Sequence, residues 1–231
     1  MLNVNADDSF PDSNAETSAV ASVSPSLLKT HTGLSLVYRG MIVSFALGLL
    51  ALVTPFLLYS GLVSSRFFLG ILGSVAAVTW LMLFTGAYLC LAVPQEFGTR
   101  PALVTSMALN ILMVFCSGYV QHIVPFRYET PMMCVDLGLG VFSAMFFVAF
   151  LKRLAAHIEG DQLEARAGML LRWMQVLGIL LLLVIMGAFA RIGFVGVLNL
   201  PILIILAFIL RPILALVRGV RDGLGTIPGV P

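Results

Sequence analysis

Charged residues are scarce in this chain of 231 residues, where Asp, Glu, Lys and Arg together make up 10 % of the sequence. A soluble domain carries about a quarter. Hydrophobic residues make up 60 %, and the mean hydropathy is +1.05, which excludes an ordinary water-soluble globular domain. The 13 basic residues barely outnumber the 11 acidic ones and form no continuous patch, so we expect no nucleic-acid partner.

Cysteine is also scarce, and the spacings of common active sites are missing. Cys90, Cys116 and Cys134 form no C-x-x-C pair and lie in or beside apolar segments, where a thiol behaves as a small hydrophobe. The sequence has no Gly-x-Ser-x-Gly elbow, no His-Glu-x-x-His helix and no phosphate-binding glycine loop. We therefore expect no cofactor and no metal site.

Uninterrupted apolar sequence is what the chain has in abundance. Its long runs each carry at most one formal charge, and about 20 helical residues suffice to cross a bilayer core of about 30 Å. The runs show no period of two, which favours helices over a β-barrel. We predict an all-α polytopic transmembrane bundle of six helices, with spans at about 41–63, 68–93, 102–124, 131–151, 172–190 and 195–215.

The distribution of Lys and Arg predicts the orientation of these spans. Ten of these residues lie in the N-terminal segment, in the loops after the second and fourth spans, and in the C-terminal segment. The other loops hold only three, Arg66, Arg127 and Arg191. Basic residues are retained on the cytoplasmic side. We therefore expect a multi-pass protein of the inner (plasma) membrane with both termini in the cytoplasm.

The segments that flank the transmembrane domain (34–218) are polar. Residues 1–33 are rich in serine and acidic residues and show no periodic apolar face, which predicts a disordered cytoplasmic tail. A short interfacial helix over 26–39 is the alternative for its last part. Residues 152–170 predict a cytoplasmic helical hairpin whose second helix starts near Asp161, and 219–231 predict a short C-terminal cytoplasmic tail.

Asp136 is the only acidic residue well inside an apolar run. A carboxylate at that depth costs several kcal/mol unless it is neutral, paired or hydrated. Two interpretations stay open: a pocket in which Asp136 binds a proton or cation with His122 as a relay, or an ion pair with Arg127 or Arg191 that ties the outer helix ends together. The predicted intramembrane polar cluster comprises Asp136, His122, Gln121, Asn110, Arg127 and Arg191.

The connection between the second and third spans contains Pro94, which disfavours helix in the residue before it and predicts the end of the second helix. This connection is either a stiff turn or a recognition loop that uses Pro94, Glu96 and Arg100. Nothing in these patterns specifies an activity. We expect a non-enzymatic scaffold or accessory subunit that contacts the lipid bilayer and a membrane-protein partner or a second copy. A small-solute or proton-coupled transporter that uses the Asp136 region is the alternative, and an intramembrane lipid-acting enzyme is a second alternative.

Overall fold

The computed structural model describes residues 13–59, 65–122, 129–158, 161–189 and 195–226. This part of the chain forms six α-helices and one short 3-10 helix, so the predicted all-α class is confirmed. In chain order the elements are α1 (Ser13–Tyr59), α2 (Ser65–Cys90), η1 (Gln95–Phe97), α3 (Arg100–His122), α4 (Glu129–His157), α5 (Asp161–Phe189) and α6 (Val195–Gly225).

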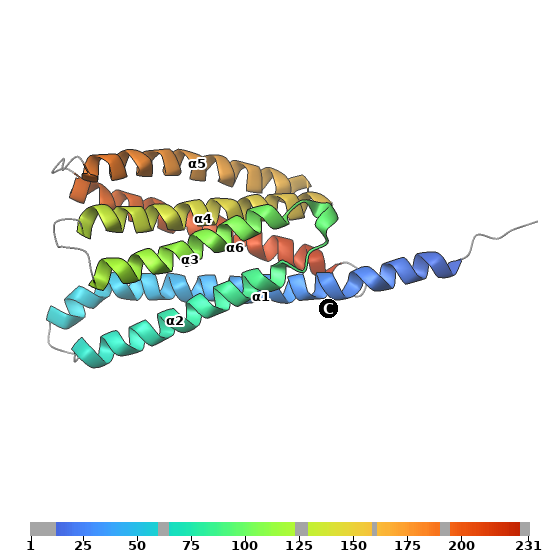
Figure 1. Cartoon of the computed structure of the whole chain (residues 1–231), viewed down its shortest axis with the longest axis horizontal. Helices are drawn as coiled ribbons and strands as arrows, with labels where there is room; N and C mark the ends of the chain where they lie inside the picture. The colour runs from blue at the N-terminus through green and yellow to red at the C-terminus, as the bar shows by residue number, and fades with distance from the viewer. Residues whose placement is uncertain (1–12, 60–64, 123–128, 159–160, 190–194, 227–231) are drawn as a thin grey trace, which may run out of the picture.

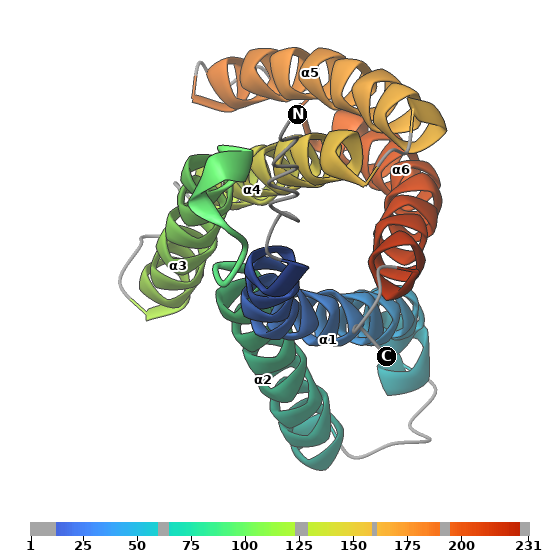
Figure 2. The ribbon, with the colours of Figure 1, turned by 90° about the vertical axis from the view of Figure 1, so that its right-hand side faces the viewer.

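Successive helices run antiparallel along one long axis (Figure 1). The most extensive contacts join α1 to α2, α3 to α4 and α4 to α5, while α6 packs against α1 and α5 and closes the bundle (Figure 2). Helices α2 and α3 barely touch, although they are consecutive in the chain. As a result α2 lies at the edge of the bundle. The start of α1 and the end of α6 lie at the same end of the bundle (Figure 1).

Three helices among the described residues are long and apolar enough to cross a membrane. These candidate spans are Gly70–Cys90 in α2, Val135–His157 in α4 and Asp161–Gly187 in α5, and they indicate a multi-pass membrane protein. A shorter apolar helix covers Arg100–Cys116 in α3. The other predicted spans, 41–63, 102–124 and 195–215, all include residues whose side chains lie outside the described part of the chain.

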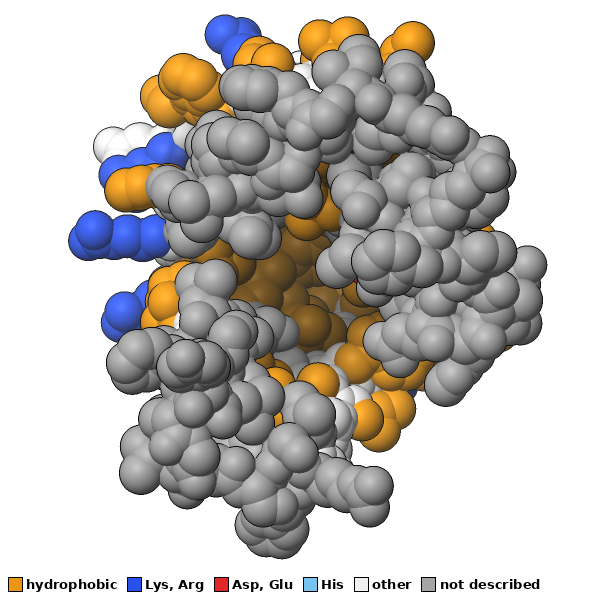
Figure 3. Space-filling model, turned by 90° about the vertical axis from the view of Figure 1, so that its left-hand side faces the viewer, with side chains coloured by type: hydrophobic (Ala, Val, Ile, Leu, Met, Phe, Trp, Pro, Cys, Tyr) orange, Lys and Arg blue, Asp and Glu red, His pale blue; other side chains and the backbone are white. Residues whose placement is uncertain are grey.

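The buried core gathers at the end of the bundle where α1 begins and α6 ends. Leu34, Leu103, Phe150, Leu154 and Val217 are each fully buried there, and they come from four different helices. Further along the helices, large apolar side chains are exposed. Viewed from that opposite end, the described side chains that are visible between the helices are mostly hydrophobic (Figure 3). Among the described residues, the fully buried core side chains thus gather mainly at the first of these two ends.

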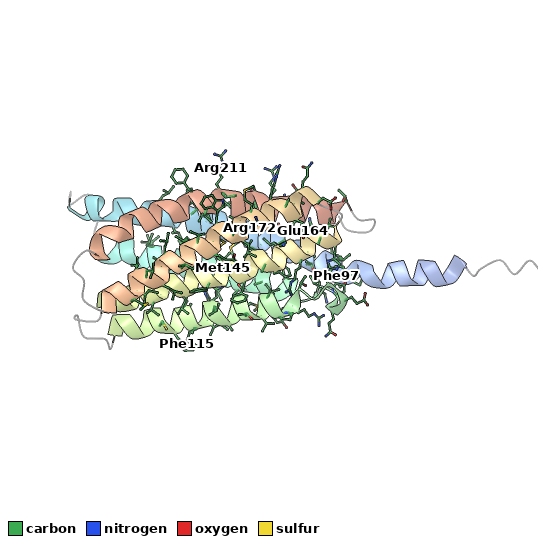
Figure 4. All side chains as sticks on the ribbon, turned by 90° about the horizontal axis from the view of Figure 1, so that it is seen from above. Phe97, Phe115, Met145, Glu164, Arg172 and Arg211 are labelled. Atoms are coloured by element: carbon green, nitrogen blue, oxygen red, sulfur yellow. The ribbon has the colours of Figure 1, made fainter. Side chains whose placement is uncertain are left out.

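Apolar side chains on the flanks of the bundle face outward, as expected where lipid is the solvent. Phe115 on α3 is 72 % exposed and points away from the other helices (Figure 4). Arg211 on α6 projects from the opposite flank (Figure 4). Because lipid tails are as apolar as Phe115 and the other exposed apolar side chains, the exposure of these side chains carries no penalty in a membrane.

The N-terminal helix begins earlier than the sequence predicts. Helix α1 starts at Ser13, inside the segment expected to be a disordered tail, and Leu27, Thr30 and Leu34 are at most 5 % exposed. Residues 25–33 are helical in the described chain, in line with the alternative of a helix over 26–39, while the disorder of the tail as a whole stays a prediction. The physical reason for the burial of Leu27, Thr30 and Leu34 is their spacing of three and four, which places these side chains on one face of a helix that packs against the end of α2. Residues 1–12 lie outside the described part of the chain.

The C-terminal helix also extends beyond its predicted end. Helix α6 continues to Gly225, and Val220 and Leu224 are fully buried where a tail was expected from residue 219. They belong to the same core as Ala155 and Ala167 of the helical hairpin formed by α4 and α5. The end of α6 therefore stabilises this hairpin, whose second helix starts at Asp161, near which the sequence places its start.

Candidate functional site

Two serines join α3 to α4 inside the bundle. Ser106 and Ser143 are 4 % and 3 % exposed, and the Oγ of each donates a hydrogen bond of 2.9 Å to the backbone carbonyl oxygen of the other. The two Oγ atoms lie 3.1 Å apart. Small side chains allow the two backbones to come this close, and each hydroxyl finds an acceptor on the facing helix.

Asn110 extends this contact by one helical turn. Its Nδ2 donates to the Oγ of Ser143 at 2.6 Å and to the carbonyl oxygen of Ser106 at 3.2 Å. We call Ser106, Asn110 and Ser143 the polar ladder. Both amide hydrogens of Asn110 are used within the ladder, while the part of the chain that the structure describes supplies no donor to its Oδ1. All donors of the ladder are thus used, and the Oδ1 of Asn110 is an acceptor without a donor among the described residues.

The polar ladder forms one wall of a cavity of about 200 Å³. Side chains from α1, α2, α3, α4 and α6 line this cavity, and most of them are apolar. Trp80 and Phe84 of α2 form the facing side, with their rings stacked at a centroid distance of 5.3 Å. The cavity lies where α2 and α3 fail to pack closely.

The chemistry that this cavity offers is limited to apolar contact and neutral hydrogen bonding. Its lining, as far as the structure describes it, contains no carboxylate, His, Lys or Arg. A serine nucleophile needs a base within hydrogen-bond reach. The hydroxyls of Ser106 and Ser143 instead donate to backbone carbonyl groups, which cannot take up a proton in this way. The arrangement suits binding or packing rather than acyl transfer.

Two members of the predicted polar cluster, Asn110 and Asp136, have side chains within the described part of the chain. Asp136 is half-buried on α4, seven residues before Ser143, or about 10 Å along the helix axis. Asn110 is bonded to the serines instead. The other predicted members, Gln121, His122, Arg127 and Arg191, have side chains outside the described part of the chain. Their grouping around Asp136 stays a prediction.

The connection between α2 and α3 is attached to the end of α4. The Nη1 of Arg153 donates to the carbonyl oxygen of Gly98 at 2.6 Å, and the ring of Phe97 stacks on His157 at 4.3 Å. Arg100 donates its Nε to the carbonyl oxygen of Val93 at 3.0 Å, so it holds its own loop together. These contacts favour the interpretation of a stiff turn.

Of the predicted recognition residues, Pro94 precedes η1, and Glu96 is exposed. The acid is therefore the member of this set that is best placed for an outside contact, because Arg100 is engaged within the loop. A recognition role for Pro94, Glu96 and Arg100 stays a prediction.

A glycine contact between α1 and α2 was missed by sequence reasoning. A Cβ atom placed on Gly33 would lie 2.6 Å from the carbonyl oxygen of Gly86, and one on Gly86 would lie 2.7 Å from that of Gly33. Beside them the Sγ of Cys90 faces the carbonyl oxygen of Thr30 at 3.9 Å. The two backbones touch because neither glycine has a side chain. Trp80 and Phe84 were also missed, although their spacing of four places both on one face of a helix.

Comparisons with known proteins add no family. No protein-family profile matches the chain, and neither does any curated protein or solved structure. The interpretation of the site therefore depends on its own geometry.

Proposed function

We propose that this chain is a six-span protein of the inner membrane, with both termini in the cytoplasm, that acts as a non-enzymatic scaffold or accessory subunit. The orientation is supported by the position of its basic residues. Arg100 and Arg166 lie near the starts of α3 and α5, and Lys152 and Arg218 lie near the ends of α4 and α6. These helix ends contribute to the same buried core as Leu27, which lies beside Lys29 in α1. Such a concentration of cations is typical of a cytoplasmic side.

A role in assembly is supported by one observation, the low burial of the outer face of α2. The candidate span in α2 is only 11 % buried within the chain, against 39 % for that in α4 and 33 % for that in α5. This face also contains small residues. Gly70 and Gly73 have open space where a Cβ atom would stand, and Ser74 is exposed. Small residues on an exposed span are what closely packed transmembrane helices use at their contacts.

A non-enzymatic role is further supported by how the chain uses its buried polar groups. The hydroxyl groups of Ser106 and Ser143 and the amide group of Asn110 bond one another, with no ionisable group beside them in the described lining of the cavity. General acid–base chemistry needs a group that titrates near the reacting atoms. These neutral hydrogen bonds hold α3 against α4, which is a structural use of the buried polar groups.

Photocrosslinking in native membranes tests the assembly role. A photoreactive amino acid at Gly73 on α2 should give one discrete protein adduct, and a matched probe at Ala108, exposed on α3, should give lipid adducts only. An adduct of twice the chain mass identifies a second copy as the partner, and another mass identifies a different subunit. Equal lipid labelling at both positions, with no protein adduct, would contradict the proposal.

The carrier alternative depends on Asp136 and is tested separately. In proteoliposomes, the substitution Asp136→Asn should leave proton permeability unchanged and alter only thermal stability if the chain is an accessory subunit. A proton-coupled carrier would instead lose a pH-driven flux on the same substitution, with the protein still folded. Ser74→Ala, which changes an exposed hydroxyl bonded within its own helix, serves as the control.

A further inference from the structure

The cavity beside the polar ladder has the size of a binding site for a small apolar group. Its volume is about 200 Å³. An apolar cavity of about 150 Å³ is known to hold a benzene molecule. The lining side chains Met41, Trp80, Phe84 and Met107 are unbranched or aromatic, and these residue types adapt well to an apolar chain or ring.

Bilayer molecules have a lateral route to this cavity. Helices α2 and α3 barely contact each other, and both contribute to the lining. The α2 side of this seam is the least buried of the three candidate spans. A molecule dissolved in the hydrocarbon core of the membrane therefore reaches the cavity without crossing water.

The polar groups in the wall define what the occupant must carry. The open Oδ1 of Asn110 accepts a hydrogen bond but cannot donate one, while both Nδ2 hydrogens are committed to Ser106 and Ser143. An oxygen left without a donor in an apolar site is unfavourable. The cavity lining that the structure describes has no charged side chain to neutralise a charged ligand. The occupant should thus be uncharged, mostly apolar and equipped with one O–H donor.

We propose that the cavity between the α1–α2 and α3–α4 hairpins binds an uncharged amphiphile from the bilayer, whose hydroxyl group donates to the Oδ1 of Asn110 while its apolar chain or ring lies against Trp80 and Phe84. Pure hydrocarbon would leave the amide oxygen without a donor. A fatty-acid carboxylate would bring a charge that no described lining residue balances. This site is separate from the outer face of α2 that carries the proposed assembly role.

Tryptophan fluorescence tests this assignment directly, because the chain contains only two tryptophans. Trp80 lines the cavity, whereas Trp173 on α5 is 63 % exposed, so Trp173→Phe leaves a single reporter at the site. The purified full chain in detergent is titrated with three probes of equal length, namely 10-bromodecan-1-ol, 1-bromodecane and 10-bromodecanoate. Bromine quenches indole fluorescence on contact.

The alcohol should quench Trp80 saturably and bind about five- to tenfold tighter than the alkane, which is the effect of one neutral hydrogen bond. The carboxylate should bind more weakly than the alcohol. Asn110→Ala should lower the affinity for the alcohol to that for the alkane. Ala144→Leu, which fills the cavity, should abolish saturable quenching, whereas the matched change Ala108→Leu on the exposed face of α3 should not.

Two results would overturn the proposal. One is equal affinity for the alcohol and the alkane in the parent protein, which would mean that Asn110 recognises no donor. The other is quenching that persists unchanged in Ala144→Leu, which would mean that the probes reach Trp80 from the surrounding detergent. Circular dichroism of each variant establishes that it is folded before the titrations are compared.

Discussion

Ser106 and Ser143 hold α3 and α4 together through reciprocal hydrogen bonds, in which each hydroxyl donates to the carbonyl oxygen of the other residue at 2.9 Å. Neither bond is available to an isolated helix, because each joins residues 37 positions apart in the sequence. If either bond were missing within the membrane, no water would be present to hydrogen-bond the unpaired hydroxyl and carbonyl groups. This pair therefore fixes the register of the hairpin that also forms one wall of the cavity.

Removal of either hydroxyl should lower the stability of the bundle. Hydrogen bonds between membrane helices contribute on average about 0.6 kcal/mol, with a maximum of about 1.7 kcal/mol. Ser143→Ala should have the larger effect, because Asn110 Nδ2 also loses its acceptor at 2.6 Å. The free energy of unfolding in mixed detergent measures the loss. In a double-mutant cycle with Ser106→Ala the two losses should roughly add, because both acceptors are backbone carbonyl groups that the substitutions leave in place. A double variant no less stable than Ser143→Ala alone would contradict a separate contribution from Ser106.

Gly33→Ala and Gly86→Ala should each separate α1 from α2. A methyl group at either position would stand less than 3 Å from a backbone oxygen of the other helix, so the backbones themselves must move. Such overpacking typically costs about 1–3 kcal/mol. Thermal unfolding in detergent measures the effect.

The matched controls for these two variants are Gly70→Ala and Gly73→Ala, where a methyl group meets open space. The controls should be neutral or more stable than the parent, because alanine favours helix over glycine by up to about 1 kcal/mol. Helix propensity alone would raise stability at all four positions, so a gain at Gly33 and Gly86 equal to that of the controls would contradict the close approach of these two glycines.

Thr99→Val should raise stability. Thr99 is fully buried at the start of α3, and its Oγ1 has no hydrogen-bond partner within the described part of the chain. Valine has nearly the same shape, and its methyl group avoids the burial of an unpaired hydroxyl, so a gain of about 1 kcal/mol is expected. Thr79→Val is the comparison, because the hydroxyl of buried Thr79 donates to the carbonyl oxygen of Val75 at 2.7 Å. A loss at position 99 as large as that at position 79 would show that Thr99 has a partner in the membrane.

Reporter fusions at the two ends of the chain should both give cytoplasmic signals. The first helix begins and the last helix ends at the same end of the bundle, where the core side chains also gather (Figure 1). The basic residues concentrate in the segments assigned to that side, by ten to three. Fusions of a phosphatase and of a fluorescent protein after residue 231 and before residue 1 measure the orientation. A periplasmic signal from one end alone would mean an odd number of spans.

Part of the fold follows from local sequence. Long apolar runs between polar loops predict helices in a membrane, since the backbone must satisfy its own hydrogen bonds there. Pro94 predicted the end of α2 to within a few residues, and Asp161 predicted the start of α5. These features depend on residues that are neighbours in the chain, so they can be predicted from the sequence alone.

The features that the sequence left out arise where distant segments meet. Residues 25–33 have too few apolar side chains to predict burial on their own, and Leu27 and Leu34 become buried only because other helix ends stand beside them. The hydrogen bond from Asn110 to Ser143 was not predicted either, because it depends on how α3 and α4 are rotated toward each other. Depth along a helix can be counted from a sequence, but rotation about its axis depends on packing.

The sequence by itself determined the all-α class, the number of long helices and the uneven distribution of basic residues, because hydropathy, helix-breaking residues and charge act over short distances along the chain. Only the tertiary structure decided that Gly33 meets Gly86, that α2 lies at the edge and that a charge-free cavity opens between two hairpins. In a membrane, apolar surface alone does not select which helices pair. Close approach of small residues and a few interhelical hydrogen bonds make that choice, and both exist only once the helices are side by side.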